Sequence, residues 1–522
     1  MFEDRTIFPP VPLILPYGMG VLTAYLKEHG IYVEQDDLAI RFNQGRAFLG
    51  ILGHCGFEMN GFHKDIAAFF EMDRLSCRLE GLLAKVLVST AIKGFDIIGF
   101  SIFSYLHFIF ALLLSHKIKQ LTDTPIVFGG PFISLYGQLY PSAFEYIDFM
   151  ITGDGTEPLS QLGRCLAQKN SPGHIPGIIY KHKGKLEAIP RERRPLEKMP
   201  MPDFAGLPLD LYIVKKFDEK LLLPYQTSRG CNNSCNFCNY KMMNPSYEHK
   251  SYDKIIRELE RMKEEYGSDY FEFSDSAINS SYKYCEGLCQ AFIDAKINIR
   301  WSGFASIERL DREILGKMKS AGCKRLNIGL ESGSDRMRGS MGKRFSREQA
   351  QEVLRESSGI GIQNWLFFIS GYPLECDEDI KDTVDFIREN KKHFFFGHVT
   401  AFSLEYGSEL WAHPEKHGIT NLTPRTDGIA LFMPDRPGHA FGFDEIEGLR
   451  WREKQIQQRR STRKIKRAIK KCLIFNPNGL LRKALIKRLI CFAKEIFYIR
   501  PIYKKSDNSS SCQPIYQKDQ FF

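Results

Sequence analysis

Residues Ser228–Tyr240 read SRGCNNSCNFCNY and bring three cysteines, Cys231, Cys235 and Cys238, into one short loop. Three thiolates from a single loop leave one iron of a four-iron four-sulfur (4Fe-4S) cluster without a protein ligand. An open iron is what a substrate or cofactor needs in order to coordinate directly. A structural zinc site is the alternative, but zinc takes four ligands, and the nearest further candidate, His249, lies eleven residues after Cys238. The spacing therefore predicts a 4Fe-4S cluster held by these three cysteines.

The same stretch predicts the fold around it, because it follows an apolar strand and opens a regular alternation of strands and helices. Residues 221–230 read as a strand into a loop, and a helix is predicted over 252–266. Further strands alternate with helical stretches in the segments 269–276, 296–304, 323–332 and 361–373. Five or six such units indicate a partial or full parallel barrel, whose catalytic loops lie at the carboxyl ends of its strands. We expect this barrel over residues 219–410, with the cysteine loop on its catalytic face.

An α/β domain is predicted before the barrel. Apolar strands are expected in the segments 95–103, 124–132 and 147–155, and a helix over 106–120 separates the first two. This alternation is typical of a doubly wound parallel sheet, in which ligands lie at the carboxyl ends of the strands. We assign residues 1–171 to this domain, 172–218 to a hairpin turning at Lys183-Gly184 and a proline-rich linker, and 411–522 to a C-terminal region.

The composition is that of a globular protein, with 43% apolar and 26% charged residues. No apolar run reaches the roughly 18 uncharged residues that a bilayer span needs, and the first residues have no signal-peptide pattern. We therefore expect a cytoplasmic protein. Thirteen cysteines, an odd number, argue against a disulfide framework.

The positive net charge is concentrated near the C-terminus. Between Arg450 and Lys505 there are 19 Lys and Arg residues against two acidic ones, whereas the whole chain carries +10. Basic and apolar residues alternate there at roughly helical spacing, which is typical of helices that contact a membrane surface, a nucleic acid or a partner. We expect a basic helical tail that makes a peripheral membrane contact. The alternative is a solvated face of a helix packed on the barrel.

The CxxxCxxC motif after the first barrel strand, with Phe237 before the third cysteine, resembles the radical S-adenosylmethionine (SAM) superfamily. The resemblance implies that the open iron is chelated by the amino and carboxylate groups of SAM. It also implies electron transfer from a reductant such as flavodoxin or ferredoxin, which cleaves SAM to a 5′-deoxyadenosyl radical.

Three later motifs extend this resemblance and imply SAM contacts beside Phe237. FEFSDS is similar to the motif whose acidic residue contacts the methionine amino group, here Asp275 with Glu272 as a second candidate. NIGLESGS is similar to the motif whose Glu331 reaches the ribose, and ISGYPLE, with Gly371, resembles the strand and turn that support the adenine. The alternatives are that a serine of ESGS caps a helix and that Asp275 is a turn residue.

The first domain resembles the cobalamin-binding domain that precedes the cluster domain in one large subfamily. The similar segments are PPVPLILPYGMG with its Gly18–Gly20 turn, GFSIFS, FGGPFIS and TGDGTEPL, so that both resemblances together cover about residues 8–400. They imply cobalamin contacts at Gly129, Gly130, Gly153 and Gly155. The DxHxxG motif that supplies a histidine to cobalt is absent. The alternative is a domain kept for substrate or partner binding after loss of the cofactor.

This subfamily mostly transfers a methyl group from methylcobalamin to an unactivated carbon or phosphorus, and some members close or contract rings. We therefore expect a methyltransferase acting on an unknown small molecule or peptide, with no nucleic-acid partner. A tRNA methylthiotransferase would need a second cluster in the first domain, where Cys55, Cys77 and Cys165 are scattered. An iron–sulfur protein that docks a partner without turnover is the non-enzymatic alternative.

Overall fold

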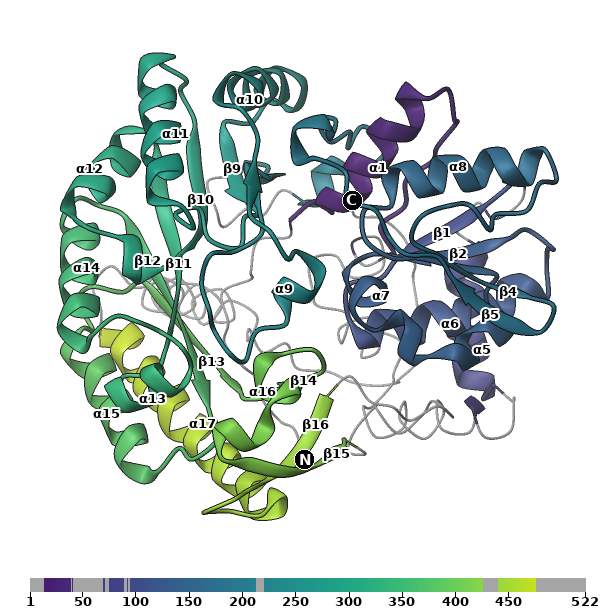
Figure 1. Ribbon diagram of the computed structural model, residues 1–522. Coiled ribbons are helices and arrows are strands. Elements are labelled where there is room, and N and C mark those ends of the chain that lie inside the picture. Colours follow the sequence, from purple (N-terminus) through teal and green to yellow (C-terminus); the bar gives the residue numbers. More distant parts are fainter. Residues whose placement is uncertain are drawn as a thin grey trace, which may run out of the picture.

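The computed structural model describes residues 14–38, 75–88, 94–212, 220–425 and 440–475, together with residues 40, 69, 70 and 92. Figure 1 shows two α/β bodies side by side, the N-terminal domain and a larger barrel. The predicted strand that would precede Pro9 and the chain beyond Phe475 lie outside the described residues.

The first domain contains three parallel strands in chain order, β1 paired with β2 and β2 paired with β3. Helices cover both faces, and α1 and α8 lie on the opposite side of the sheet from α5, α6 and α7 (Figure 1). Two apolar cores separate along the same division, one containing α5 and α6 and the other containing α8. The bounds are α1 (Tyr17–Glu28), α5 (Cys77–Val88), β1 (Ile98–Ser101), α6 (Tyr105–Lys119), β2 (Ile126–Gly129), α7 (Pro131–Tyr136), β3 (Phe149–Ile151) and α8 (Thr156–Ala167).

The predicted doubly wound parallel sheet is wrong in one respect, because the described sheet is mixed. Strands β4 (Ile178–His182) and β5 (Lys185–Ala188) form the predicted hairpin, but β4 pairs antiparallel with β3 and extends the first sheet. Strand order along the sheet is β1-β2-β3-β4-β5, so the described strands contain no reversal of order. Ile178 and Ile179 are buried against the domain's apolar cores, which explains why the hairpin joins this sheet.

Six parallel strands form the second body, in the order β13-β12-β11-β10-β9-β6. Strands β6 and β13 are not paired with each other, so the sheet is an open, partial barrel, as predicted. Its strands are β6 (Leu223–Tyr225), β9 (Tyr270–Phe273), β10 (Arg300–Ala305), β11 (Cys323–Glu331), β12 (Gln363–Ser370) and β13 (Phe396–Ala401). Its outer helices are α10 (Tyr252–Tyr266), α11 (Tyr282–Asp294), α12 (Arg312–Ser320), α14 (Arg347–Gly359) and α15 (Asp377–Glu389).

Smaller elements close the ends of the barrel. Strands β7 (Ser228–Arg229) and β8 (Glu248–His249) pair around the cysteine loop, and a separate antiparallel sheet has the order β14-β16-β15. These elements are β14 (Leu404–Glu405), β15 (Ile419–Pro424), β16 (Ala440–Glu445), α9 (Tyr240–Met243), α13 (Asp335–Ser340) and α16 (Glu409–Ala412). Short 3-10 turns lie at Gly137–Leu139, Pro141–Glu145, Leu196–Lys198, Leu209–Tyr212, Ile307–Arg309 and Pro414–His417. No helix in the described part of the chain is long and apolar enough to cross a membrane.

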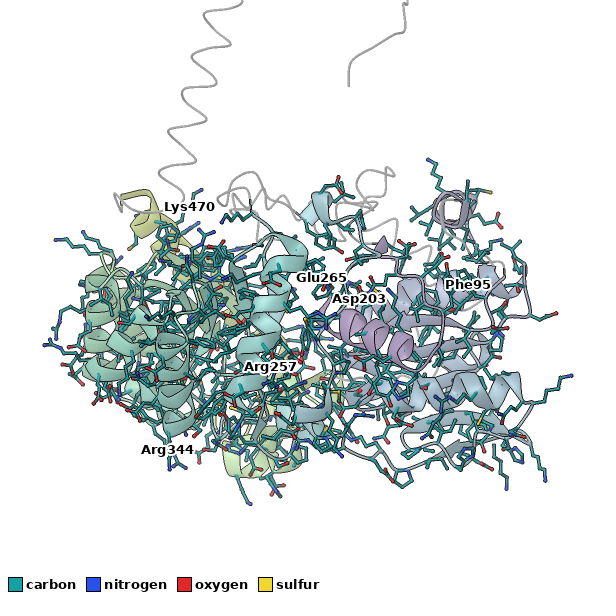
Figure 2. The ribbon with its side chains drawn as sticks, turned by 90° about the horizontal axis from the view of Figure 1, so that it is seen from above. Phe95, Asp203, Arg257, Glu265, Arg344 and Lys470 are labelled. Carbon is teal, nitrogen blue, oxygen red and sulfur yellow. The ribbon has the colours of Figure 1, made fainter. Side chains whose placement is uncertain are left out.

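The linker fastens the first helix to the barrel. Gly18 and Gly20 lie inside α1, which corrects the predicted turn there. A Cβ on Gly20 would collide with the ring of Phe204, so glycine lets the linker pack directly on this helix. The Phe204 backbone N–H donates to the Tyr266 hydroxyl at the end of α10 over 3.0 Å, and Figure 2 shows Asp203 between α1 and this part of α10.

The basic C-terminal region is a barrel helix over the part that the structure describes. Helix α17 (Trp451–Phe475) runs alongside β13 and α15 (Figure 1). Its apolar face joins the barrel core through Ile465, Ala468, Ile469, Cys472 and Leu473. The expectation of a separate surface tail is therefore wrong for residues 451–475, and the alternative of a packed helix with a solvated face is confirmed there.

We predict that Ile465→Ala lowers the free energy of unfolding by about 2–4 kcal/mol, because the side chain is fully buried and leaves a cavity. Ile456→Ala on the same helix is the matched control, since that side chain is 58% exposed. The control should change stability by less than about 0.5 kcal/mol. Chemical denaturation of both variants measures the difference, and equal small effects would show that α17 does not stabilise the barrel.

Candidate active site

The cysteine loop lies between β7 and α9, at the carboxyl end of the first barrel strand. Cys231 and Cys235 are half-buried, Cys238 is exposed, and all three thiols are free. Gly230 opens the loop with φ +94°, and a Cβ there would meet the backbone of Ser246 and Tyr247. Only glycine accommodates this turn, so the chain can direct the next residue, Cys231, over the end of the barrel.

One side of the loop is held by the segment that follows β9. The Asn232 backbone N–H donates to Ser280 Oγ over 2.8 Å, and the Ser276 hydroxyl donates to the Gly230 carbonyl over 2.6 Å. The buried carboxylate of Asp275 accepts hydrogen bonds from Thr227 and from the backbone N–H of Ser228. The segment 274–281 therefore fixes both the strand entering the loop and the loop itself.

The other side is held by α13 and the turn after β12. Asn236 donates its backbone N–H to the Met341 carbonyl over 3.2 Å, and its side-chain oxygen accepts from the Tyr372 hydroxyl over 2.7 Å. Leu410 of α16 donates to the Asn236 carbonyl over 3.0 Å. The middle of the loop is thus anchored to three elements that are distant in sequence.

Electrostatics around the thiols depend on one buried ion pair. Burial raises the pKa of Cys235 to about 11, the nearby Lys343 opposes this rise, and Glu331 adds to it. Lys343 Nζ lies 3.2 Å from the Glu331 carboxylate and donates to the Gly329 carbonyl. Burial alone would lower the pKa of Lys343, but Glu331 and Cys235 outweigh it and raise that pKa. Lys343 therefore stays protonated beside the thiols.

The three thiols of the loop are the donor type that iron–sulfur clusters use. Within the described ranges, no three Cys, His, Asp or Glu residues gather tightly enough to hold one metal ion. Cys231, Cys235 and Cys238 nevertheless share one short loop, which hydrogen bonds hold on both sides. Thiolates are the ligands of 4Fe-4S clusters, and metal binding deprotonates thiols that burial keeps neutral. The residues present therefore fit the predicted cluster.

The residues predicted to contact SAM lie around this loop, but they have different partners within the protein. Phe237 is partly buried against the apolar cluster that contains Met341 and Tyr372. Glu331 stands at the end of β11 with φ +65°. Asp275 holds Thr227 and Ser228, as described above. Glu272, the second candidate, is bound inside the barrel by Arg325 and Asn327.

Gly371 ends β12 with both of its peptide groups occupied inside the protein. Its N–H donates to Glu375 over 2.5 Å, and its carbonyl accepts from Gln458 of α17 over 3.1 Å. A SAM contact at Gly371, like those at Phe237, Asp275 and Glu331, stays a prediction. Ser334 also caps α13, so the helix-cap alternative for ESGS is confirmed without excluding a role for Glu331.

The four predicted cobalamin glycines gather at the carboxyl end of β2 and β3. Two of them have structural reasons to be glycine. Gly130 has φ +95°, and a Cβ there would lie 2.7–2.8 Å from backbone atoms of Ile102. Gly153 has φ +80° and lies against the Arg191 side chain. Gly129 and Gly155 show no positive φ. A Cβ on Gly129 would be 3.7 Å from the nearest atom, the Ile151 carbonyl oxygen. The edge is thus lined by backbone, which suits close approach of a large ligand.

A buried arginine connects this edge to the cysteine loop. Arg229, two residues before Cys231, has a side chain only 9% exposed. Its guanidinium pairs with Asp154, in the loop after β3, and with Glu248 of β8 at 2.9–3.0 Å. It also donates to the Arg194 carbonyl of the linker over 2.6 Å. The predicted cobalamin loop, the linker and the cysteine loop are therefore joined at one charged centre.

Sequence reasoning missed Lys343 and the partners of Arg229. Lys343 follows Glu331 by twelve residues, and Asp154 precedes Arg229 by 75. No local spacing relates such residues, so the only sequence signals were their positions beside recognised motifs: Asp154 lies within TGDGTEPL, and Lys343 follows ESGS.

Comparison with known proteins matches one segment of the chain to a family. Residues 225–387 match the model of the radical SAM superfamily. An uncharacterized methyltransferase of Pyrococcus horikoshii is 26% identical over 293 residues, which cover 55% of this chain and 62% of that protein. An anaerobic magnesium-protoporphyrin IX monomethyl ester cyclase of Synechocystis is 23% identical over 308 residues, which cover 56% of this chain and 58% of that enzyme.

Two solved structures share the overall fold. The radical SAM methyltransferase TsrM of Kitasatospora setae, with cobalamin and a [4Fe-4S] cluster bound, superposes with a TM-score of 0.59 at 16% identity, covering 86% of this chain and 88% of TsrM. The cobalamin-dependent radical SAM enzyme OxsB, with aqua-cobalamin and SAM bound, gives 0.57 at 18% identity, covering 83% of this chain and 62% of OxsB. The barrel segment 225–387 therefore matches the radical SAM superfamily, as the sequence predicts, and the chain shares the overall fold of these two enzymes.

Proposed function

We propose that this protein is a cobalamin-dependent radical SAM enzyme that methylates an unactivated centre of its substrate. One observation carries the proposal: Arg229 ties the cysteine loop directly to the glycine-lined edge of the first domain. Two cofactors held at these places would face each other across the junction. The names of the relatives, which include methyltransferases, support the same reaction class.

Each part of the site has a defined task in this proposal. When bound by the three cysteines, the cluster supplies the electron that cleaves SAM. Lys343 places a buried ammonium beside Cys235, which suits the SAM carboxylate, and Glu331 offers an acceptor for the ribose hydroxyls. Tyr372 and the segment 274–281 keep the loop in place while ligands bind. No histidine is assigned to cobalt.

Ring formation is the second candidate, because several relatives are ester cyclases.

A methylthiotransferase would need a second cluster in the first domain. There Cys77 begins α5 and Cys165 is buried in α8, while Cys55 lies outside the described residues. A domain that has lost cobalamin remains the alternative for the first sheet. The substrate, the flavodoxin or ferredoxin reductant and a cytoplasmic location stay predictions.

The cluster assignment is tested by changing Cys231, Cys235 and Cys238 together to Ala. After anaerobic reconstitution the variant should retain no cluster and should not cleave SAM, because the iron ligands are gone. Iron and sulfide analysis, with electron paramagnetic resonance of the reduced protein, measures the loss. The triple change of Cys55, Cys77 and Cys165 to Ala is the control and should keep the full iron content. Iron lost from the control instead would reveal a cluster in the first domain.

The cobalamin assignment is tested by Gly129→Val. The fold has room for the new Cβ, but the side chain would stand on the edge where the corrinoid is placed, so corrinoid retention should fall at least about tenfold. Gly99→Val on the neighbouring strand β1 is the matched control, with a Cβ 3.6 Å from Val127. Absorbance after loading with hydroxocobalamin gives the bound fraction. Transfer of a deuterated methyl group from SAM to the bound corrinoid distinguishes methylation from ring formation.

The junction is tested by a double-mutant cycle of Asp154→Asn and Arg229→Gln. We expect a coupling free energy of about 1.5–3 kcal/mol, because the guanidinium is buried and its hydrogen bonds are charge-assisted. The Lys27–Asp203 pair, with side chains 45% and 22% exposed, is the control and should couple by less than about 1 kcal/mol. Chemical denaturation of the reconstituted protein supplies the four stabilities of each cycle. Equal coupling in both cycles would show that the Arg229–Asp154 pair is no stronger than an exposed ion pair, and the proposal would lose the observation on which it depends.

A further inference from the structure

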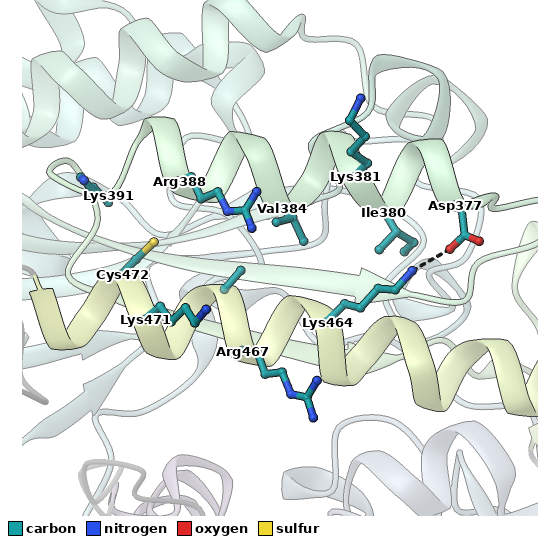
Figure 3. Close-up of a pocket in the computed structure, with 11 residues that line it drawn as sticks. Asp377, Ile380, Lys381, Val384, Arg388, Lys391, Lys464, Arg467, Lys471 and Cys472 are labelled. Atoms are coloured by element: carbon teal, nitrogen blue, oxygen red, sulfur yellow. Dashed lines mark hydrogen bonds and ion pairs between the residues drawn. The ribbon is translucent and has the colours of Figure 1, made fainter.

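A basic groove runs between α15 and α17, on the outside of the barrel and away from the junction of the two domains (Figures 1 and 3). Its volume is about 600 Å³. Apolar side chains of Ile380, Val384, Ala468 and Cys472 line it. Six cationic side chains surround them, all on exposed residues: Lys381, Arg388, Lys391, Lys464, Arg467 and Lys471.

These cations are only partly neutralised by the protein. Asp377 is the one acidic residue that lines the groove, and it pairs with Lys464 over 2.8 Å. Arg388 pairs with Asp385 over 3.0 Å. Lys381, Arg467 and Lys471, which come from both helices, form no ion pair with any of the described residues. Like charges gathered in this way attract a counter-anion.

We propose that this groove binds the headgroup of an acidic phospholipid and so docks the barrel on a membrane surface. The phosphate would lie among the cations, and the first methylenes of an acyl chain would cover the apolar side chains between the helices. A groove that is cationic at its rim and apolar between the helices matches an amphiphile better than a free anion. The proposal concerns a surface outside the catalytic junction and does not depend on the proposed reaction.

The chain beyond the described residues favours this occupant. Residues 480–499 read LLRKALIKRLICFAKEIFYI, a basic and apolar sequence typical of a helix lying in a membrane interface. Because this segment carries the same sign of charge as the groove, charge repulsion opposes its covering the groove itself. No aromatic residue lines the groove, whereas single-stranded nucleic-acid sites use aromatic rings to stack bases. A membrane surface would engage both the groove and the segment that follows α17.

The experiment measures cosedimentation of the full chain with phosphatidylcholine vesicles that contain or lack phosphatidylserine. The wild type should bind only the acidic vesicles. The variant Lys381→Gln, Arg467→Gln, Lys471→Gln should bind at least about tenfold more weakly, since each cation near an acidic surface contributes several-fold. The control removes three exposed arginines elsewhere on the barrel, Arg261, Arg312 and Arg355, each to Gln, and should keep most of the binding.

Further measurements distinguish the groove from the segment that follows α17 and from a site for free anions or RNA. Acidic vesicles should protect residues 380–391 from hydrogen exchange in the wild type and not in the groove variant. Deleting residues 476–522 leaves α17 intact, and the shortened chain should still lose further binding when the groove is neutralised.

Equal losses in the groove and control variants would overturn the proposal, as would displacement of the protein by inorganic phosphate alone. Binding of RNA that the groove variant loses, without vesicle binding, would also overturn it. Because SAM cleavage should be unchanged in both triple variants, failure here is distinguishable from failure of the proposed reaction.

Discussion

The guanidinium of Arg229 is the constraint on which the arrangement of the two domains depends. A charge with a side chain only 9% exposed has lost most of its hydration, and leaving such a charge without its partner costs about 3–5 kcal/mol. Its partners come from three separate parts of the chain: Asp154 in the first domain, the Arg194 carbonyl in the linker and Glu248 in the barrel. Moving the first domain and the linker away from the barrel would break the bonds to Asp154 and to the Arg194 carbonyl together and would leave Glu248 as the remaining partner. The cysteine loop begins two residues later, so the constraint that holds the domains also fixes the loop.

Local patterns in the sequence predict the parts of this fold that local interactions determine. The helix expected over 252–266 has those bounds because its apolar and charged residues follow one helical period without interruption. The cysteine loop was found because its three cysteines are neighbours in sequence. Lys343 and Asp154 were not found, because their roles exist only after β11 and β3 bring them beside residues that are far away along the chain. The sequence therefore locates the cysteine loop better than the charged residues around it.

Two of the errors in the fold share a physical cause. The hairpin of β4 and β5 and the helix α17 were each predicted as the right type of element and given the wrong neighbours. Ile178 and Ile179 show that β4 is apolar on both faces, but not that its pairing partner is the free edge of β3. Apolar side chains on an element show that it must pack against something. Which element it packs against depends on the shape of the rest of the domain. The packing partner of an element is therefore harder to predict from local sequence than the type of the element.

Helix α17 shows why net charge alone misleads about such an element. Ten of its eleven charged residues are Lys or Arg, which favours a surface tail when residues are only counted. Yet Ile465 is fully buried, and Gln458 reaches inward to the carbonyls of Gly371 and Phe402 at the ends of β12 and β13. A helix needs only one apolar stripe to dock, and the remaining positions are free to carry charge toward solvent. The same helix therefore supports the catalytic end of the barrel with one face while its other face presents cations outward, and removing its charges is physically separable from removing its packing.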